Sequence, residues 1–355
     1  MNKGDIINGF LILEDFKVAG GMSKISFAER DGKEYFIKEF LYPKYPVEGS
    51  PGSERIKEQK RKACQVFEEH HRKLNELIGS KTSGLGGNLV YALYFFREGS
   101  TYYKVTEKIN TEILTLKEIS ELPLDKLFII AMSVCQSISI LHSLNIVHGD
   151  LKPDNILIKE ASRGIYSGKL IDFDDSYFST EPPSDRHRMV GTPEYYSPEL
   201  AEYIMDEDAD ISGNSLTLSS DIFTLGIILT EYFTGDKPRV HDSKPIWKAI
   251  KEGDKLYFAK PLTPDLEELI FSMLSLDSKA RPSIKVVHQT LREIKEGKYK
   301  KKIGHTSEKV KRVRIRGSLV SDATTDRKRT PICKAKADSI GKRAGLRGKG
   351  LNIKK

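Results

Sequence analysis

The sequence predicts an α+β protein with two lobes, a small antiparallel β lobe that carries one helix and a larger α-helical lobe that follows it. Three observations support this fold class. Short runs rich in aromatic and β-branched residues recur through the first hundred positions, one long amphipathic stretch interrupts them, and helical spacing dominates after about residue 112. With 355 residues and 38% hydrophobic content, the chain can build one such domain and still carry an extension.

The small lobe is predicted over about residues 8–109. Turns at Gly20-Gly21 and Asp31-Gly32 separate its first apolar runs, as in an antiparallel meander. The expected strands are 10–19, 24–31, 33–41, 88–99 and 100–109. A Ser-Glu start, apolar residues at helical spacing and a closing glycine predict one helix over 53–79.

The large lobe is predicted over about residues 110–295, and its apolar residues recur at helical spacing. The expected helices are 124–145, 218–234, 264–275 and 283–295. The apolar run at 221–233 contains an Asp and a Glu and is shorter than the roughly 20 residues that a membrane span needs. We therefore expect no membrane partner.

Charge is unevenly divided along the chain. Residues 298–355 hold 20 Lys and Arg against four acids, a balance of +16, so the rest of a chain whose net charge is +8 carries −8. Gly, Ser, Thr and Lys dominate this segment, and it has no periodicity, which predicts a basic, disordered C-terminal tail. We expect the tail to bind acidic partners or nucleic acid through charge alone, because no aromatic residue follows Tyr299.

Cysteine content and the N-terminus predict a cytoplasmic protein. Three cysteines, Cys64, Cys135 and Cys333, are too few and too widely spaced for a disulfide framework or a zinc site. The first residues contain no apolar segment of the kind that marks a secretory signal.

The stretch HGDLKPDNIL at 148–157 carries the strongest chemical signal. It places Asp150 and Asn155 just before an aliphatic run, and KLIDFDDS at 169–176 places Asp172 just after another. The carboxamide and the second carboxylate make a hard oxygen site suited to Mg²⁺ held against substrate phosphates. Asp150 is then free to accept a proton from an incoming hydroxyl.

This stretch resembles the catalytic loop of eukaryotic-like protein kinases, whose pattern H-R-D-L-x-x-x-N is matched by His148, Asp150, Leu151 and Asn155. The resemblance covers about residues 8–295 and implies the two-lobed protein kinase-like fold. It further implies that Asp150 is the catalytic base, that Asn155 and Asp172 hold Mg²⁺, and that Lys152 steadies the charge of the transferred phosphoryl group. A Lys two residues after the Asp is typical of the Ser/Thr class.

Other landmarks of the family follow in the expected order. VAGGMSKISFAE resembles the glycine-rich loop over the ATP phosphates, which assigns Gly20 and Gly21 to the nucleotide, and Lys38 matches the lysine that grips the phosphates. KVTEKI resembles the hinge between the lobes. The resemblance makes Thr106 the gatekeeper and has Glu107 to Ile109 meet the adenine through backbone groups.

The stretch GTPEYYSPE at 191–199 resembles the end of a kinase activation segment. The resemblance makes Thr192 the threonine near the catalytic Asp. It also gives structural roles to Asp221, as a buried acid, and to Arg281, as the partner of Glu199.

Four departures from the family pattern set further expectations. Gly149 replaces the arginine that pairs with a phosphorylated activation loop, which argues against that form of control. Val18 and Ser23 replace two glycines of the loop, and Asp174 replaces the Gly of D-F-G, which favours weaker nucleotide binding. On the small-lobe helix, His70 stands where a Glu should pair with Lys38, while Glu68 and Glu69 lie just before it, so that a shift of register by one could restore the pair.

Together these patterns predict an ATP- and Mg²⁺-dependent protein serine/threonine kinase, a transferase acting on Ser and Thr of protein substrates, its own hydroxyls included. Two alternatives stay open, besides a nucleic-acid-binding module that uses the basic tail. One is a pseudokinase that binds ATP as a scaffold, indicated by the unusual glycine loop and by His70. The other is a small-molecule phosphotransferase, indicated by H-G-D, although such enzymes lack the GTPEYYSPE stretch.

Overall fold

The computed structural model describes residues 2–19, 23–82, 87–109, 113–161, 164–183, 189, 191–205 and 213–299. The chain divides into two units, residues 1–301 and 302–355, and the fold below is that of the first unit. Gly20, Gly21 and the basic tail from residue 300 onward lie outside the described residues.

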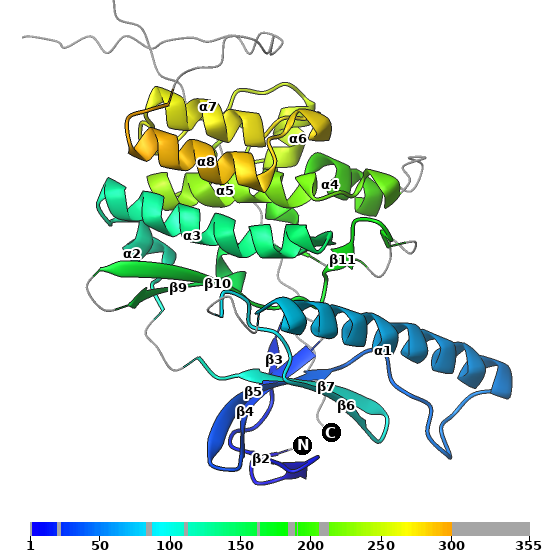
Figure 1. Ribbon diagram of the computed structural model, residues 1–355. Coiled ribbons are helices and arrows are strands. Elements are labelled where there is room, and N and C mark those ends of the chain that lie inside the picture. Colours follow the sequence, from blue (N-terminus) through cyan, green and yellow to red (C-terminus); the bar gives the residue numbers. More distant parts are fainter. Residues whose placement is uncertain are drawn as a thin grey trace, which may run out of the picture. The chain divides into compact units, whose positions relative to one another are not determined.

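The small lobe is built on an antiparallel sheet of seven strands (Figure 1). The strands are β1 (Ile6–Ile7), β2 (Phe10–Ile12), β3 (Lys17–Ala19), β4 (Ser23–Arg30), β5 (Lys33–Phe40), β6 (Tyr94–Glu98) and β7 (Thr101–Glu107). Their order is β1-β2-β4-β5-β7-β6, and β3 also pairs with β4. Apolar side chains from one face of the sheet form a small core, which consists of Ile7, Phe10, Ile12, Ala28, Ile37, Tyr103 and Val105.

The strand expected at 10–19 is in fact two strands. Leu11 pairs with Glu29, whereas Lys17 pairs with Ile25. Between these two pairs the chain of β2 and β3 is two residues longer than the opposite stretch of β4. Two extra residues are therefore inserted opposite β4, as in a β-bulge, and the Ser26 hydroxyl donates to the carbonyl of Glu14 within it. The run of apolar residues hides this break, because a bulge changes pairing without changing composition.

The strand expected at 88–99 is also shorter than predicted, since β6 begins only at Tyr94. The residues before it leave the sheet. The amide of Val90 donates to the carbonyl of Leu170, and the amide of Leu170 donates to the carbonyl of Asn88, each at 2.9 Å. This segment therefore ties the small lobe to the large one.

Helix α1 (Glu54–Thr82) confirms the expected small-lobe helix and runs beside the sheet and beyond its edge (Figure 1). Its buried side chains face two different cores. Leu74 and Ile78 join the core of the large lobe, whereas Phe67 packs against Phe40 and Tyr102 of the sheet. The helix thus contacts both lobes.

The large lobe is helical, with two short hairpin-like strand pairs (Figure 1). Its helices are α2 (Leu116–Ser120), α3 (Leu124–Ser143), α4 (Pro198–Met205), α5 (Ser219–Thr234), α6 (Ile246–Lys251), α7 (Pro264–Met273) and α8 (Ile284–Lys295). Its strands are β8 (Ile146–Val147), β9 (Ile156–Ala161), β10 (Ile165–Leu170) and β11 (Tyr177–Phe178). The four helices that the sequence predicts are confirmed. The helices that it missed have eight residues or fewer, too few for a clear helical period.

Helices α3 and α5 form the centre of the large lobe. α3 is long and apolar enough to cross a membrane by length and composition alone. In the fold it packs against α8, β10 and α5, and half of its residues are buried. Core helices of soluble proteins have the same composition, so this helix is by itself weak support for a membrane span.

Candidate active site

The loop after β8 is fixed to the core through His148 and Asp221. The backbone amide of His148 donates to Oδ2 of Asp221 at 2.9 Å, and Nε2 of the His148 ring donates to the carbonyl of Ile171 at 3.1 Å. Asp221 lies in the first turn of α5, is 3% exposed, and also pairs with Nε2 of His142 at 3.0 Å. A buried acid therefore holds the backbone just before Asp150, which is the structural role that the sequence predicts for it.

Asp150, Lys152, Asn155 and Thr192 come together as one hydrogen-bonded cluster. Lys152 Nζ donates to Asp150 Oδ2 at 2.6 Å and to Thr192 Oγ1 at 3.0 Å. Asn155 Nδ2 donates to the carbonyl of Asp150 at 2.7 Å, and Thr192 Oγ1 donates to Asp150 Oδ1 at 3.1 Å. In this cluster the carboxylate of Asp150 accepts a hydrogen bond from a hydroxyl and lies beside an ammonium group.

A close backbone contact, which the sequence does not reveal, explains why residue 149 is a glycine. The φ of Gly149 is +83°, and a Cβ built on it would lie 2.1 Å from the carbonyl oxygen of Asp175. No side chain fits there unless the backbone moves, because real Cβ contacts are essentially never shorter than 3.0 Å. Gly149 therefore does more than remove an arginine, since it allows the catalytic loop to contact the segment after Asp172.

Lys38 of β5 is paired with two carboxylates from that segment. Its Nζ lies 2.9 Å from Asp172 Oδ1 and 2.6 Å from Asp174 Oδ2. Burial alone would lower the pKa of Lys38, but the carboxylates of Asp174 and Asp172 outweigh burial and raise it. The backbone of Asp172 has a φ of +60°, so the left-handed position falls on Asp172 itself and not on Asp174.

Lys104 of β7 is a member of this cluster that the sequence interpretation missed. It is the direct cross-strand partner of Lys38, its side chain is 8% exposed, and its Nζ pairs with Asp174 Oδ1 and, at 3.3 Å, with Asp172 Oδ1. Burial alone would raise the pKa of Asp174, but Lys104 and Lys38 hold it well below its usual range. A lysine in the middle of a strand rich in aromatic and β-branched residues is the signal that could have pointed to a buried partner acid.

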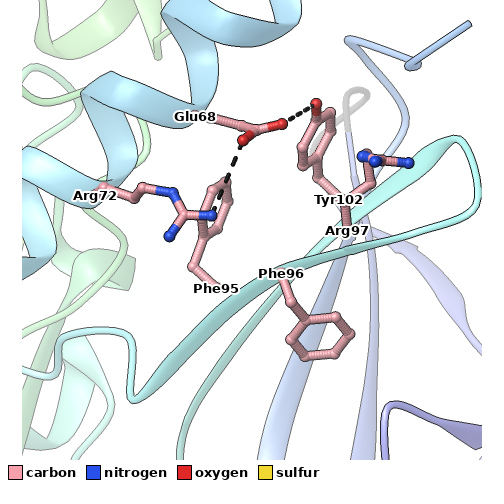
Figure 2. A pocket seen from close by; sticks show the side chains of 6 residues that line it. All are labelled: Glu68, Arg72, Phe95, Phe96, Arg97 and Tyr102. Carbon is pink, nitrogen blue, oxygen red and sulfur yellow. Dashed lines mark hydrogen bonds and ion pairs between the residues drawn. The ribbon is translucent and has the colours of Figure 1, made fainter.

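Helix α1 supplies no carboxylate to Lys38. Glu68 accepts a hydrogen bond from the Tyr102 hydroxyl at 2.6 Å and lies 3.9 Å from Arg72, on the wall of a cavity of about 260 Å³ (Figure 2). Glu69 is exposed and bonds to Gln65 of the same helix. The register shift considered from sequence is therefore wrong: among the described residues, the carboxylates that pair with Lys38 are those of Asp172 and Asp174.

Two neighbouring histidines of α1, His70 and His71, lie where the family pattern places a glutamate. His71 is 4% exposed and packs on the rings of Phe40 and Phe95, and burial lowers its pKa to about 3, so it is neutral. His70 Nε2 donates to the carbonyl of Ser176 at 2.8 Å. His70 thus joins α1 to the segment that follows Asp174.

A second contact strengthens this connection between α1 and β11. Lys73 Nζ lies 2.8 Å from a carboxylate oxygen of Glu181 and 4.3 Å from the centre of the Phe178 ring. Besides its core contacts, α1 is therefore held by residues 176–181 and not by an ion pair with Lys38.

The expected hinge lies at the end of β7. Thr106 is buried, and Glu107 ends the strand, with Ile109 two residues further. The carboxylate of Glu107 pairs with Lys169 of β10 at 3.1 Å. Glu107 also lines an open cavity of about 470 Å³, together with Gly32, Lys33, Glu34, Tyr35, Leu93 and Lys108. The adenine contacts expected of Glu107 and Ile109 stay a prediction, as do the phosphate contacts expected of Gly20 and Gly21.

The end of the 191–199 stretch is anchored as predicted. Arg281 binds Glu199 through two hydrogen bonds of 2.6 and 2.8 Å, and its side chain is fully buried. Ser220 adds a third donor to the same carboxylate at 2.9 Å. This paired charge fixes the start of α4 to the base of the large lobe.

A comparison with known families decides how the two lobes and their polar cluster are classified. The model of the protein kinase domain matches residues 55–292, about two thirds of the chain. The chain belongs to the protein kinase family. The two-lobed kinase fold that the sequence predicts is thereby confirmed, and the match includes Asp150, Asn155 and Asp172.

Curated relatives of this kinase domain are serine/threonine and related protein kinases. It is similar to the phosphorylase b kinase gamma catalytic chain, liver/testis isoform, of Homo sapiens, at 30% identity over 235 residues that cover 64% of this chain and 52% of the relative. It is also similar to Aurora/IPL1-related protein kinase 2 of Caenorhabditis briggsae, at 27% identity over 203 residues, 56% of this chain and 57% of the relative. The similarity to the serine/threonine-protein kinase PknA of Corynebacterium glutamicum is 32% over 163 residues, 43% of this chain and 32% of the relative.

The matched part of this kinase domain spans about half the length of the first of these relatives. The family match begins within α1, so strands β1 to β5 precede it. The identification of Lys38 with the phosphate-binding lysine of kinases therefore depends on its contact with Asp172.

Proposed function

We propose that this kinase domain is an ATP- and Mg²⁺-dependent protein serine/threonine kinase that transfers the γ-phosphoryl group to Ser and Thr hydroxyls of proteins, its own included. The observation that carries the proposal is the cluster around Asp150. Its carboxylate already accepts a hydrogen bond from a hydroxyl, that of Thr192, with Lys152 bound to both groups.

The chemistry that follows is an in-line displacement. A bond forms between the substrate hydroxyl oxygen and the γ-phosphorus, the bond to the leaving oxygen of ADP breaks, and Asp150 accepts the hydroxyl proton. Lys152 lies 2.6 Å from Asp150 and can neutralise charge on the transferred group. Lys38 is the cation from β5 that would hold the phosphates.

Asn155 and Asp172 fit a magnesium ion by the chemistry of their donor set. The amide nitrogen of Asn155 is bonded to Asp150, which leaves its carbonyl oxygen as the ligand, and the Asp172 side chain is 35% exposed and can turn toward an ion. Among the described residues no cluster of three His, Cys, Asp or Glu forms a metal cage. Mg²⁺ needs none beside a nucleotide, because it takes most of its ligands from phosphates and water, and when bound it would offset the phosphate charge.

Transfer of radiolabelled γ-phosphate from Mg-ATP tests the proposal. The full chain is incubated alone and with a generic basic protein, beside Asp150→Asn, which keeps the size of the side chain but removes the proton acceptor. We expect label on serine and threonine with the wild type and a loss of at least about 100-fold with the variant. Equal labelling by both proteins would show that Asp150 is not the base.

Two other outcomes would support the alternatives. ATP binding without any transfer would favour a pseudokinase scaffold, a function consistent with the pairing of Asp172 to two lysines. Label on free aminoglycosides or sugars, with none on protein, would favour a small-molecule phosphotransferase.

We also propose a cytoplasmic location and a charge-based role for the tail. Cys64 and Cys135 are buried free thiols, which is consistent with a reducing compartment. Residues 298–355 would hold acidic partners or nucleic acid by charge, so their binding to a DNA duplex should fall steeply between about 50 and 200 mM salt. Binding that is unchanged over this range would contradict a charge-based role.

A further inference from the structure

Two lysines and two aspartates form a closed, charge-balanced group between the sheet and the segment after β10. Lys38 and Lys104 are opposite each other on β5 and β7, so both side chains leave the same face of the sheet. Both ammonium groups contact both carboxylates, those of Asp172 and Asp174. The positive and negative charges are equal in number.

The two aspartates differ in their exposure. The Asp172 side chain is 35% exposed, whereas that of Asp174 is 13% exposed and lies directly against both lysines. Asp172, the more exposed of the two, is therefore the one that can turn to a solvated ion, and both lysines then keep Asp174 as a partner. If Asp172 holds Mg²⁺, Asp174 stays as the carboxylate that contacts Lys38.

Among the described residues of helix α1, no carboxylate pairs with Lys38. In protein kinases the phosphate-binding lysine must be held by an ion pair with a glutamate of this helix. Here Glu68 points to Tyr102 and Arg72, as Figure 2 shows. The neutral ring of His71 fills this part of the interior instead.

We propose that Asp174 is the positioning residue for Lys38, in place of a helix carboxylate, and that Lys104 is the counter-ion that holds Asp174 in place. The inference rests on the proposed function, because it assigns Lys38 to the phosphates of ATP. Without Lys104, the remaining three groups would have one excess negative charge. Without Asp174, the two lysines would share only the carboxylate that the metal needs.

With this assignment, the orientation of Lys38 does not depend on α1. Both carboxylates that hold Lys38 come from the same three-residue segment, Asp172 to Asp174. The lysine is thus aligned by the segment that also carries the metal ligand.

Three full-length variants test the proposal: Asp174→Asn, Lys104→Met and the double variant. Transfer kinetics give kcat and KM for Mg-ATP, calorimetry gives the affinity for Mg-ATP, and thermal unfolding without nucleotide gives the melting temperature. Lys244→Met is the matched control, because it removes another paired lysine, one bound to Asp254 at 2.8 Å in the loops of the large lobe. It should keep transfer within about twofold of the wild type.

Asp174→Asn should lower kcat/KM by about 100-fold and weaken Mg-ATP binding by about tenfold, because Lys38 loses its fixed carboxylate. Lys104→Met should reduce kcat/KM less. The double variant should remain as impaired as Asp174→Asn, since restoring charge balance does not return a carboxylate to Lys38. Recovery of the double variant to within about threefold of the wild type would overturn the proposal, because Asp174 would then serve only to neutralise Lys104.

Unfolding gives the second readout. The melting temperature of the double variant should exceed the value obtained by adding the two single shifts, because each single variant leaves a buried charge without its partner. Additive shifts would contradict the role of Lys104 as counter-ion. If the wild type binds Mg-ATP but transfers nothing, the proposed function fails, whereas the order of the Mg-ATP affinities still decides the role of Asp174.

Discussion

A methyl group added at Gly149 should damage this kinase domain more than the same change at any comparable glycine. Alanine at a φ of +83° costs about 1–2 kcal/mol for its left-handed backbone. Its Cβ would also lie 2.1 Å from the Asp175 carbonyl, whereas ordinary contact begins at 3.4 Å, so the backbone must move by about 1.3 Å. Overpacking of this kind costs a further ~1–3 kcal/mol.

A control separates the two contributions. Gly253 has a φ of +74° and nothing within 4 Å of its added Cβ, so Gly253→Ala carries the backbone cost alone. Urea unfolding, followed by the fluorescence of Trp247, the single tryptophan of the chain, should give Gly149→Ala a free energy of unfolding about 1–3 kcal/mol below that of Gly253→Ala.

The same change should also reduce phosphate transfer. Displacing the backbone at Gly149 moves Asp150, and a misplacement of about 1 Å in a catalytic group can reduce the rate by about 100-fold. Gly149→Arg, which restores the residue usual in the family, should be as damaging as Gly149→Ala because it carries the same Cβ. Equal stability of Gly149→Ala and Gly253→Ala would refute the steric argument.

Two further changes test the large lobe through the fluorescence of Trp247. Arg281→Met should lower the free energy of unfolding by about 3–5 kcal/mol, because the buried carboxylate of Glu199 loses its partner, and adding Glu199→Gln should recover part of the loss; a loss below about 1 kcal/mol would contradict this. Burial raises the pKa of Glu231 from 4.5 to about 7, so between these pH values the folded state keeps a proton that the unfolded state releases. The free energy of unfolding should therefore fall by up to ~3 kcal/mol as the pH rises from about 4.5 to 7. Glu231→Gln, which still accepts the hydrogen bond of Tyr195, should therefore be more stable than the wild type at pH 8 and equal to it at pH 4, whereas a difference that is the same at both pH values would disprove the titration.

Most of the cluster around Asp150 could be predicted because three of its members are close in sequence. Asp150, Lys152 and Asn155 lie within six residues, so one turn of chain brings them together whatever the rest of the fold does. Thr192 was found only through the order of family motifs, since nothing in its spacing fixes a distance to Asp150, whereas Asp172 was also indicated by its place just after an aliphatic run.

The group of four charges could not be predicted in full from the sequence. Lys104 meets Lys38 only because β5 and β7 pair in one particular register, and Asp174 reaches both only because the lobes adjoin. A lysine in a strand has no sequence signal for its partner when that partner is 70 residues away.

The bulge between β2 and β3 and the conformation of Gly149 were missed for a related reason. A bulge is a property of two strands together, and composition describes only one of them. Gly149 could be recognised as unusual, but the carbonyl of Asp175 that requires it comes from a segment more than 20 residues further along the chain.

The cross-strand placement of Lys38 and Lys104 has a consequence for folding. Two like charges opposite each other weaken the pairing of β5 with β7, and burying them is unfavourable until Asp172 and Asp174 arrive from the large lobe. The small sheet alone is therefore an incomplete folding unit. A fragment of residues 1–109 should remain unfolded by itself, and the two lobes should unfold in one cooperative transition.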